Sequence, residues 1–198
     1  EKFNWNGNCL DPDLRELYVK KLSEYQNPNI FSKLFGMGEH DKYMIIIYGA
    51  PRAGKTTLAK EILDKWRDSN YGKSHAIKRF GLDKYSKAKR LSITKKALAN
   101  RISVIIDGLA HTNELREPFE KLAIEYKTPI LYIEVNPGLG MAHIFNHVAV
   151  ETSIDENVEL YDIKEYHFYK SKVVRPKNVL LYCPVIKKTK QVMQFRYS

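Results

Sequence analysis

Apolar and polar residues alternate in blocks along the chain from about residue 43 onward. Residues 43–48, Tyr-Met-Ile-Ile-Ile-Tyr, form a continuous apolar run, which is typical of a central parallel strand covered on both faces. The blocks that follow predict a helix over residues 57–66, a strand over 76–80, a helix over 84–100, a strand over 103–107, a helix over 114–127 and a strand over 129–135. Strands that alternate with helices favour an α/β fold with a mainly parallel sheet flanked by helices.

The last part of the chain departs from this alternation. A short helix is predicted over residues 141–150. The stretches 179–183 and 191–195 resemble two strands around a lysine-rich turn, which predicts an antiparallel C-terminal edge of the sheet. Because no Pro/Gly/Ser-rich linker divides the chain, we expect residues 41–198 to form one catalytic domain and residues 1–40 to be an N-terminal extension or the remnant of a preceding domain.

The strongest chemical signal follows the first predicted strand directly. The segment from Gly49 to Thr56 reads Gly-Ala-Pro-Arg-Ala-Gly-Lys-Thr, which is a complete phosphate-binding loop between a strand and a helix. Backbone N–H groups of such a loop approach phosphates closely, Lys55 is expected to contact the β and γ phosphates, and the Thr56 hydroxyl is expected to hold Mg²⁺. The residues expected to bind the nucleotide are Gly49, Ala50, Pro51, Arg52, Ala53, Gly54, Lys55, Thr56 and Thr57. The chain is therefore predicted to be a P-loop (Walker A) phosphotransferase.

Two aspartates follow predicted strands and are candidates for the chemistry. Asp107 ends the strand 103–107 and is expected at the carboxyl edge of the sheet, where ligands of open α/β folds bind. It is a candidate to contact Mg²⁺ or the acceptor, although an aspartate here can also simply cap the next helix. Asp83 follows the strand 76–80, where many P-loop kinases place the carboxylate that accepts the proton of the attacking hydroxyl; a capping aspartate has the same appearance.

The charge of the chain favours a polyanionic partner. It carries 33 Lys and Arg against 23 Asp and Glu, a formal net charge of +10, and clustered cations gain affinity by displacing counterions from phosphates. One cluster follows Asp83 and consists of Lys84, Lys87, Lys89, Arg90, Lys95 and Lys96. A second cluster lies between residues 170 and 177, after several aromatic residues. Each cluster either contacts a nucleic acid, with Lys87 close to the acceptor, or only solvates a helix face.

Few features point to a membrane or to an oxidising compartment. No apolar run reaches the roughly 18 residues of a membrane span, and the first 30 residues lack the pattern of a signal peptide. Cys9 and Cys183 show no metal-ligand spacing. We expect a soluble, intracellular protein, in the cytoplasm or the nucleus.

The order of these motifs resembles the kinase domain of the polynucleotide kinase 3′-phosphatase family, over residues 44–195. In that family the phosphate loop is followed by a turn with the general base, a helix with a substrate-binding arginine, and a strand that ends in aspartate with an arginine nine residues beyond. The resemblance implies that Asp83 is the base and that Asp107 is the strand-end aspartate. It also implies that Arg90 and Arg116 bind the acceptor.

The resemblance further implies ligands and partners. ATP and Mg²⁺ would be the cofactors, and a DNA or RNA with a 5′-hydroxyl end would be the acceptor, as in nucleic-acid end repair. The lid helix of the family aligns with residues 141–147, which contain no arginine, so that His147 is the candidate for neutralising the transferred phosphoryl group. In related multidomain enzymes a phosphatase domain can precede the kinase, and residues 1–3 resemble the end of such a domain.

Three alternatives remain open from the sequence. A viral-type replication helicase is suggested by the loop and by Asn136, but residues 108–135 leave little room for a DNA-translocating hairpin and only one acid stands at Asp107. A small-molecule kinase of the nucleoside type would use the same loop. A catalytically inactive nucleic-acid-binding module would retain salt-sensitive binding without turnover.

Overall fold

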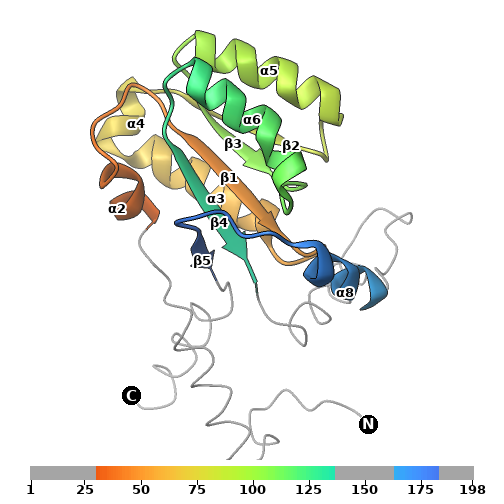
Figure 1. Ribbon diagram of the computed structural model, residues 1–198. Coiled ribbons are helices and arrows are strands. Elements are labelled where there is room, and N and C mark those ends of the chain that lie inside the picture. The colour runs from red at the N-terminus through yellow and green to blue at the C-terminus, as the bar shows by residue number, and fades with distance from the viewer. Residues whose placement is uncertain (1–29, 137–162, 183–198) are drawn as a thin grey trace, which may run out of the picture.

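The computed structural model of the chain describes residues 30–136 and 163–182 (Figure 1). The strands are β1 (Met44–Gly49), β2 (Ile77–Gly81), β3 (Ser103–Asp107), β4 (Ile130–Val135) and β5 (Leu180–Tyr182). The helices are α2 (Ile30–Phe35), α3 (Lys55–Asp68), α4 (Asn70–Ser74), α5 (Lys87–Ala99), α6 (Asn113–Glu125) and α8 (Ile163–Lys172). The predicted alternation of strands and helices between residues 43 and 135 is therefore confirmed.

The strands form one sheet in the order β2-β3-β1-β4-β5, and every neighbouring pair is parallel. Because connections between parallel strands are right-handed, the step from β1 to β2 places α3 on one face, and the steps in the opposite direction place α5 and α6 on the other. Figure 1 shows α5 and α6 side by side on that second face. The register pairs Ile47 with Asp107 and Gly49 with Val135, so that β1, β3 and β4 end along the same edge.

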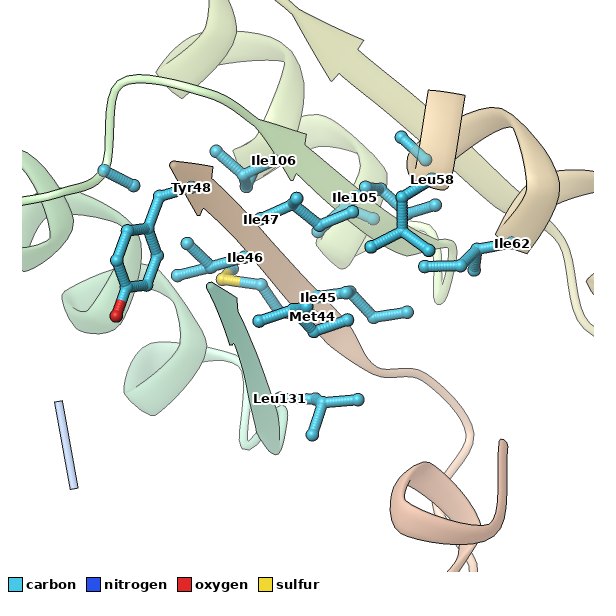
Figure 2. Packing of buried hydrophobic residues seen from close by; sticks show 14 of the residues in the cluster. Met44, Ile45, Ile46, Ile47, Tyr48, Leu58, Ile62, Ile105, Ile106 and Leu131 are labelled. Atoms are coloured by element: carbon cyan, nitrogen blue, oxygen red, sulfur yellow. The ribbon is translucent and has the colours of Figure 1, made fainter. Parts of the chain in front are cut away.

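The core is built around β1, as its continuous apolar run predicts. The side chains from Met44 to Tyr48 are buried, and Leu58 and Ile62 of α3 pack against the sheet (Figure 2). Strand β3 adds Ile105 and Ile106 beside β1. Burying aliphatic side chains of this size stabilises the fold by about 1.5–3 kcal/mol each. The loop at the end of β1 is thereby attached to a fully buried central strand.

The core begins before the boundary at residue 41 that the sequence suggests. Helix α2 buries Ile30 and Leu34 in the core, and the Phe35 ring lies 6.2 Å from the Tyr43 ring, measured between centroids. Phe35 also contacts Tyr71 of α4, another short helix that the sequence pattern does not indicate. Part of the predicted extension thus belongs to the domain.

The C-terminal edge differs from the prediction. Strand β5 lies within the stretch predicted as the first of two antiparallel strands, but it pairs parallel with β4, through Glu134 and Leu181 among others. The seven residues between α8 and β5, 173–179, carry the chain back along the sheet before β5 begins, so that β5 runs in the same direction as β4 (Figure 1). The predicted second strand at 191–195 and the predicted helix at 141–150 lie outside the described residues.

The segment after α8 is tied to the sheet and to the loop after β3. Glu134 of β4 is buried beside Tyr48, and its Oε2 accepts a hydrogen bond of 2.6 Å from Arg175 Nε. Burial, followed by the nearby Glu134 carboxylate, raises the pKa of Tyr48. The backbone N–H of Val174 donates to the carbonyl of His111 at 2.7 Å.

None of the helices within residues 30–136 and 163–182 has the length and apolar character needed to cross a bilayer.

Candidate active site

The phosphate loop connects β1 to α3 and leaves the N-terminus of α3 open to a ligand. Gly54 adopts a φ of 100°, in the left-handed region that glycine enters without steric cost, and Lys55 then begins the helix. A glycine at the N-cap offers no side-chain acceptor to the first N–H groups of this 14-residue helix. These donors and the helix dipole favour an anion at this end, as a phosphate-binding loop requires.

Lys55 is held by the loop that it belongs to. Its Nζ donates to the carbonyl oxygens of Gly49 at 3.1 Å and Ala50 at 2.7 Å. Burial lowers the pKa of Lys55 to about 8, and the Asp107 carboxylate opposes part of this shift. Gly108 packs over the side chain, since a Cβ there would lie 3.6 Å from Lys55 Cε. The Lys55 side chain therefore lies between the end of β1 and the residue that follows β3.

This lowered pKa predicts a pH-dependent affinity for ATP. Only the charged ammonium attracts phosphate, and the group loses its proton as the pH rises through about 8, so that ATP affinity is expected to fall up to about tenfold per pH unit above that point. Titration calorimetry across this range in two buffers of different ionisation enthalpy should show proton uptake on binding. Lys55→Arg is the control, because a guanidinium keeps its proton there. An affinity that stays constant above pH 8 would contradict the assignment.

Thr56 and Asp107 form the candidate magnesium site. Thr56 Oγ1 donates to Asp107 Oδ2 at 3.1 Å, and the Asp107 side chain is buried at the end of β3. A hydroxyl and a carboxylate at this spacing are the hard oxygen ligands that Mg²⁺ takes beside nucleotide phosphates. The residues present therefore fit the metal that the phosphate loop implies.

Asp83 reaches the same place from the turn after β2. Its carboxylate is 49% exposed and accepts a hydrogen bond of 2.8 Å from Arg79 Nη2, while Arg79 Nε donates to Asp107 Oδ2 at 2.7 Å. Arg79 Nη2 also lies 3.4 Å from Thr56 Oγ1. The fold thus brings Lys55, Thr56, Asp83 and Asp107 together at one edge of the sheet, although they are far apart in the sequence.

Arg90 and Arg116 do not take the acceptor-binding positions that the sequence suggests. Both side chains are buried. Arg90 Nη1 donates to the carbonyl oxygens of Asp107 and Gly108, each at 3.0 Å, and Arg116 Nη1 donates to the Ala110 carbonyl at 2.9 Å. These residues lie on the faces of α5 and α6 that turn towards the core, so that in the structure their guanidinium groups support the loop after β3. Lys87 is exposed at the start of α5.

Arg90→Ala is expected to lower the free energy of unfolding by about 3 kcal/mol, because two buried carbonyl groups lose a charged donor and the contact over the Phe119 ring is lost. Urea denaturation measures this change. The exposed neighbour Lys89→Ala is the control and should change the value by less than about 0.5 kcal/mol. If Arg90→Ala keeps its stability and instead loses oligonucleotide affinity, Arg90 contacts the acceptor after all.

Arg79 is a site residue that the motifs of the sequence do not indicate. An arginine in the middle of a strand, four residues before a candidate base, is the signal that could have identified it. Burial, followed by the charges of Lys55 and Arg116, lowers the pKa of His111, which lies in the loop between β3 and α6. His147, the expected lid residue, lies outside the described residues.

A family model described as "Chromatin associated protein KTI12" matches residues 43–173, more than half of the chain. The crystal structure of Kti12 from Chaetomium thermophilum in complex with ADP-AlF3 superposes with a TM-score of 0.56 at 16% identity, covering 78% of this chain and 97% of that one. The APS kinase CysC of Mycobacterium tuberculosis in complex with AMPPNP and APS gives a TM-score of 0.46 at 13% identity, with 79% and 98% covered.

No curated protein matches the sequence significantly. The resemblance to polynucleotide kinase 3′-phosphatases is therefore supported at the level of the P-loop kinase fold and not for that family specifically.

Proposed function

Since the chain belongs to the family of the chromatin-associated protein KTI12 and has a P-loop kinase fold, we propose that it uses ATP and Mg²⁺ to transfer the terminal phosphate. One observation carries the proposal: a half-exposed carboxylate, Asp83, is connected through Arg79 to the Thr56 hydroxyl of the phosphate loop and to the buried Asp107. A base in this position can take a proton from a nucleophile that approaches the γ-phosphate.

Each residue of the site has a distinct part in the proposed transfer. The loop and Lys55 bind and align the phosphates, and Thr56 and Asp107 would hold the metal. Mg²⁺, when bound, neutralises charge on the phosphate oxygens. Asp83 accepts the proton of the attacking hydroxyl as the new O–P bond forms and the bond to ADP breaks.

The proposed acceptor is the 5′-hydroxyl of a polynucleotide. The exposed side chains of Lys84, Lys87 and Lys89 follow Asp83 and would contact its backbone phosphates. A net charge of +10 supports a polyanionic partner. DNA and RNA are both candidates for this partner.

Hydrolysis of ATP is the second candidate function. It is favoured by the burial of Arg90 and Arg116, because the two arginines expected to bind the acceptor are engaged with backbone carbonyls. Water would then take the place of the hydroxyl. Between Asp107 and Asn136 the described chain contains α6 and β4, which leaves little room for the translocating hairpin of a helicase motor.

A single assay separates the two candidates. γ-Labelled ATP is incubated with 5′-hydroxyl DNA or RNA oligonucleotides and Mg²⁺, and both the labelled 5′ ends and the free phosphate are measured. Label on the 5′ end that is lost in Lys55→Ala supports the kinase and identifies its acceptor. Phosphate release that the oligonucleotide stimulates, without labelled ends, supports the hydrolase. A small-molecule kinase would label nucleosides regardless of polymer length.

A further inference from the structure

The Arg79 guanidinium occupies the centre of the candidate site. Its side chain, 7% exposed, extends from β2 towards the end of β3. Asp107 Oδ2 lies 2.7 Å from Arg79 Nε and 2.6 Å from Nη2, and the same oxygen accepts the 3.1 Å hydrogen bond from Thr56. Arg79 Nη1 and Nη2 also contact the two oxygens of Asp83, at 3.3 and 2.8 Å. One cation thus bridges the metal-site carboxylate and the candidate base.

A divalent cation and this guanidinium would compete for the same carboxylate oxygen, Asp107 Oδ2. Oδ2 already accepts hydrogen bonds from Thr56 Oγ1 and Arg79 Nε, and Arg79 Nη2 forms an ion pair with the same oxygen at 2.6 Å. A metal ion at Thr56 and Asp107 would also lie within a few ångströms of the guanidinium charge, where like charges repel strongly. The contacts to Asp83 are free of this conflict, because that carboxylate lies on the exposed side of Arg79.

The backbone at Gly81 makes room for the Arg79–Asp83 pair. A Cβ at this position would overlap both Asp83 Oδ1 and Arg79 Nη2. Gly81 pairs with Asp107 in the register of β2 and β3, so that the space without a side chain lies beside the metal-site carboxylate. The guanidinium therefore reaches both carboxylates from one strand.

From this geometry we infer that Arg79 competes with the divalent cation for Asp107 and positions Asp83: metal binding displaces the guanidinium from Asp107 while its ion pair with Asp83 remains. The inference rests on the proposed nucleotide and metal site. After metal binding Arg79 would contact Asp83 and no longer Asp107. Binding of the metal would therefore also set the position of Asp83, the candidate base.

Binding of Mn²⁺ alone, measured by electron paramagnetic resonance on the full chain, tests this inference without any turnover. Arg79→Gln is expected to bind Mn²⁺ at least about tenfold more tightly than the wild type, because a positive charge next to the metal ligand is removed. Arg79→Lys, which keeps the charge but not the forked contact, should lie between the two. Arg67→Gln removes an exposed arginine from the far end of α3 and is the control for net charge.

The affinity for ATP in the absence of metal is expected to change in the opposite direction to the affinity for Mn²⁺. In Arg79→Gln the carboxylates of Asp107 and Asp83 lose their shared cation and repel the phosphates, so that affinity for ATP in the presence of a chelator should fall while affinity for free Mn²⁺ rises. Adding Asp107→Asn to Arg79→Gln should abolish the gain in Mn²⁺ affinity.

Unchanged or weaker Mn²⁺ binding by folded Arg79→Gln, or by Arg79→Lys if the glutamine variant does not fold, overturns the competition. Failure of the wild type to bind ATP with Mg²⁺ would instead overturn the proposed function, so the two failures are distinguishable.

Discussion

Lys55→Ala is expected to lower turnover of ATP by at least about 10³-fold, the scale at which a cation on the transferred phosphoryl group contributes. Lys55 Nζ is anchored by the Gly49 and Ala50 carbonyl oxygens, so the charge is already fixed at the loop before the phosphates arrive. Alanine removes that charge and leaves the loop carbonyls without their donor. Steady-state release of phosphate, together with transfer of label to oligonucleotides, measures the loss.

The control for this variant is Lys65→Ala. Lys65 is exposed in the last turn of α3, far along the helix from the phosphate loop, and its loss changes the net charge by the same amount. It should retain wild-type turnover. If Lys55→Ala is folded, as shown by circular dichroism, and still turns over at more than about a tenth of the wild-type rate, the loop is not the site of phosphoryl transfer.

Asp83→Asn is expected to reduce turnover by about 10²- to 10⁴-fold while ATP affinity stays close to that of the wild type. Asparagine keeps an oxygen that accepts the hydrogen bond from Arg79 but cannot take a proton from the nucleophile. Because the Asp83 carboxylate is half exposed and is connected to the Thr56 hydroxyl through Arg79, its neutralisation is expected to leave the nucleotide contacts intact. Pre-steady-state transfer and nucleotide titration separate the chemical step from binding.

Asp64→Asn provides the matched comparison for that result. Asp64 is an exposed aspartate on α3 that lies 4.0 Å from the exposed Arg67, so its replacement removes the same charge away from the site. Full activity is expected. Undiminished transfer by Asp83→Asn would remove Asp83 from the mechanism and leave the proton acceptor to the substrate itself.

The parts of the fold that depend on local pattern could be predicted from the sequence. The apolar run at β1 must be covered on both faces, and the structure buries it completely. The phosphate loop could be recognised because its chemistry depends on a continuous segment, Gly49–Thr56. The rule that ligands bind at the carboxyl ends of parallel strands predicts the position of Asp107 at this edge, and the structure confirms that position.

The features that the sequence did not reveal depend on distant contacts. Helix α2 is only six residues long and owes its position to burial of Leu34, which no local period indicates. The direction of β5 depends on the connection 173–179, which returns along the sheet before the strand begins. Arg90 and Arg116 look like surface cations in a basic sequence, and only the packing of α5 and α6 turns them inward. Arg79 contacts both Asp107 and Asp83 because β2 pairs with β3, and this pairing cannot be read from local sequence.

The two residues of the Arg175–Glu134 ion pair are synthesised at different times, Glu134 before Arg175. At roughly 5–20 residues per second, a ribosome adds residue 175 about 2 to 8 seconds after β4 is complete. Until then, burying the Glu134 carboxylate beside Tyr48 would be costly, because the cation that pairs with it has not been made. The β4 edge of the nascent sheet is therefore expected to stay unpaired, and accessible to chaperones, until α8 and β5 emerge. The phosphate loop has been synthesised well before that point.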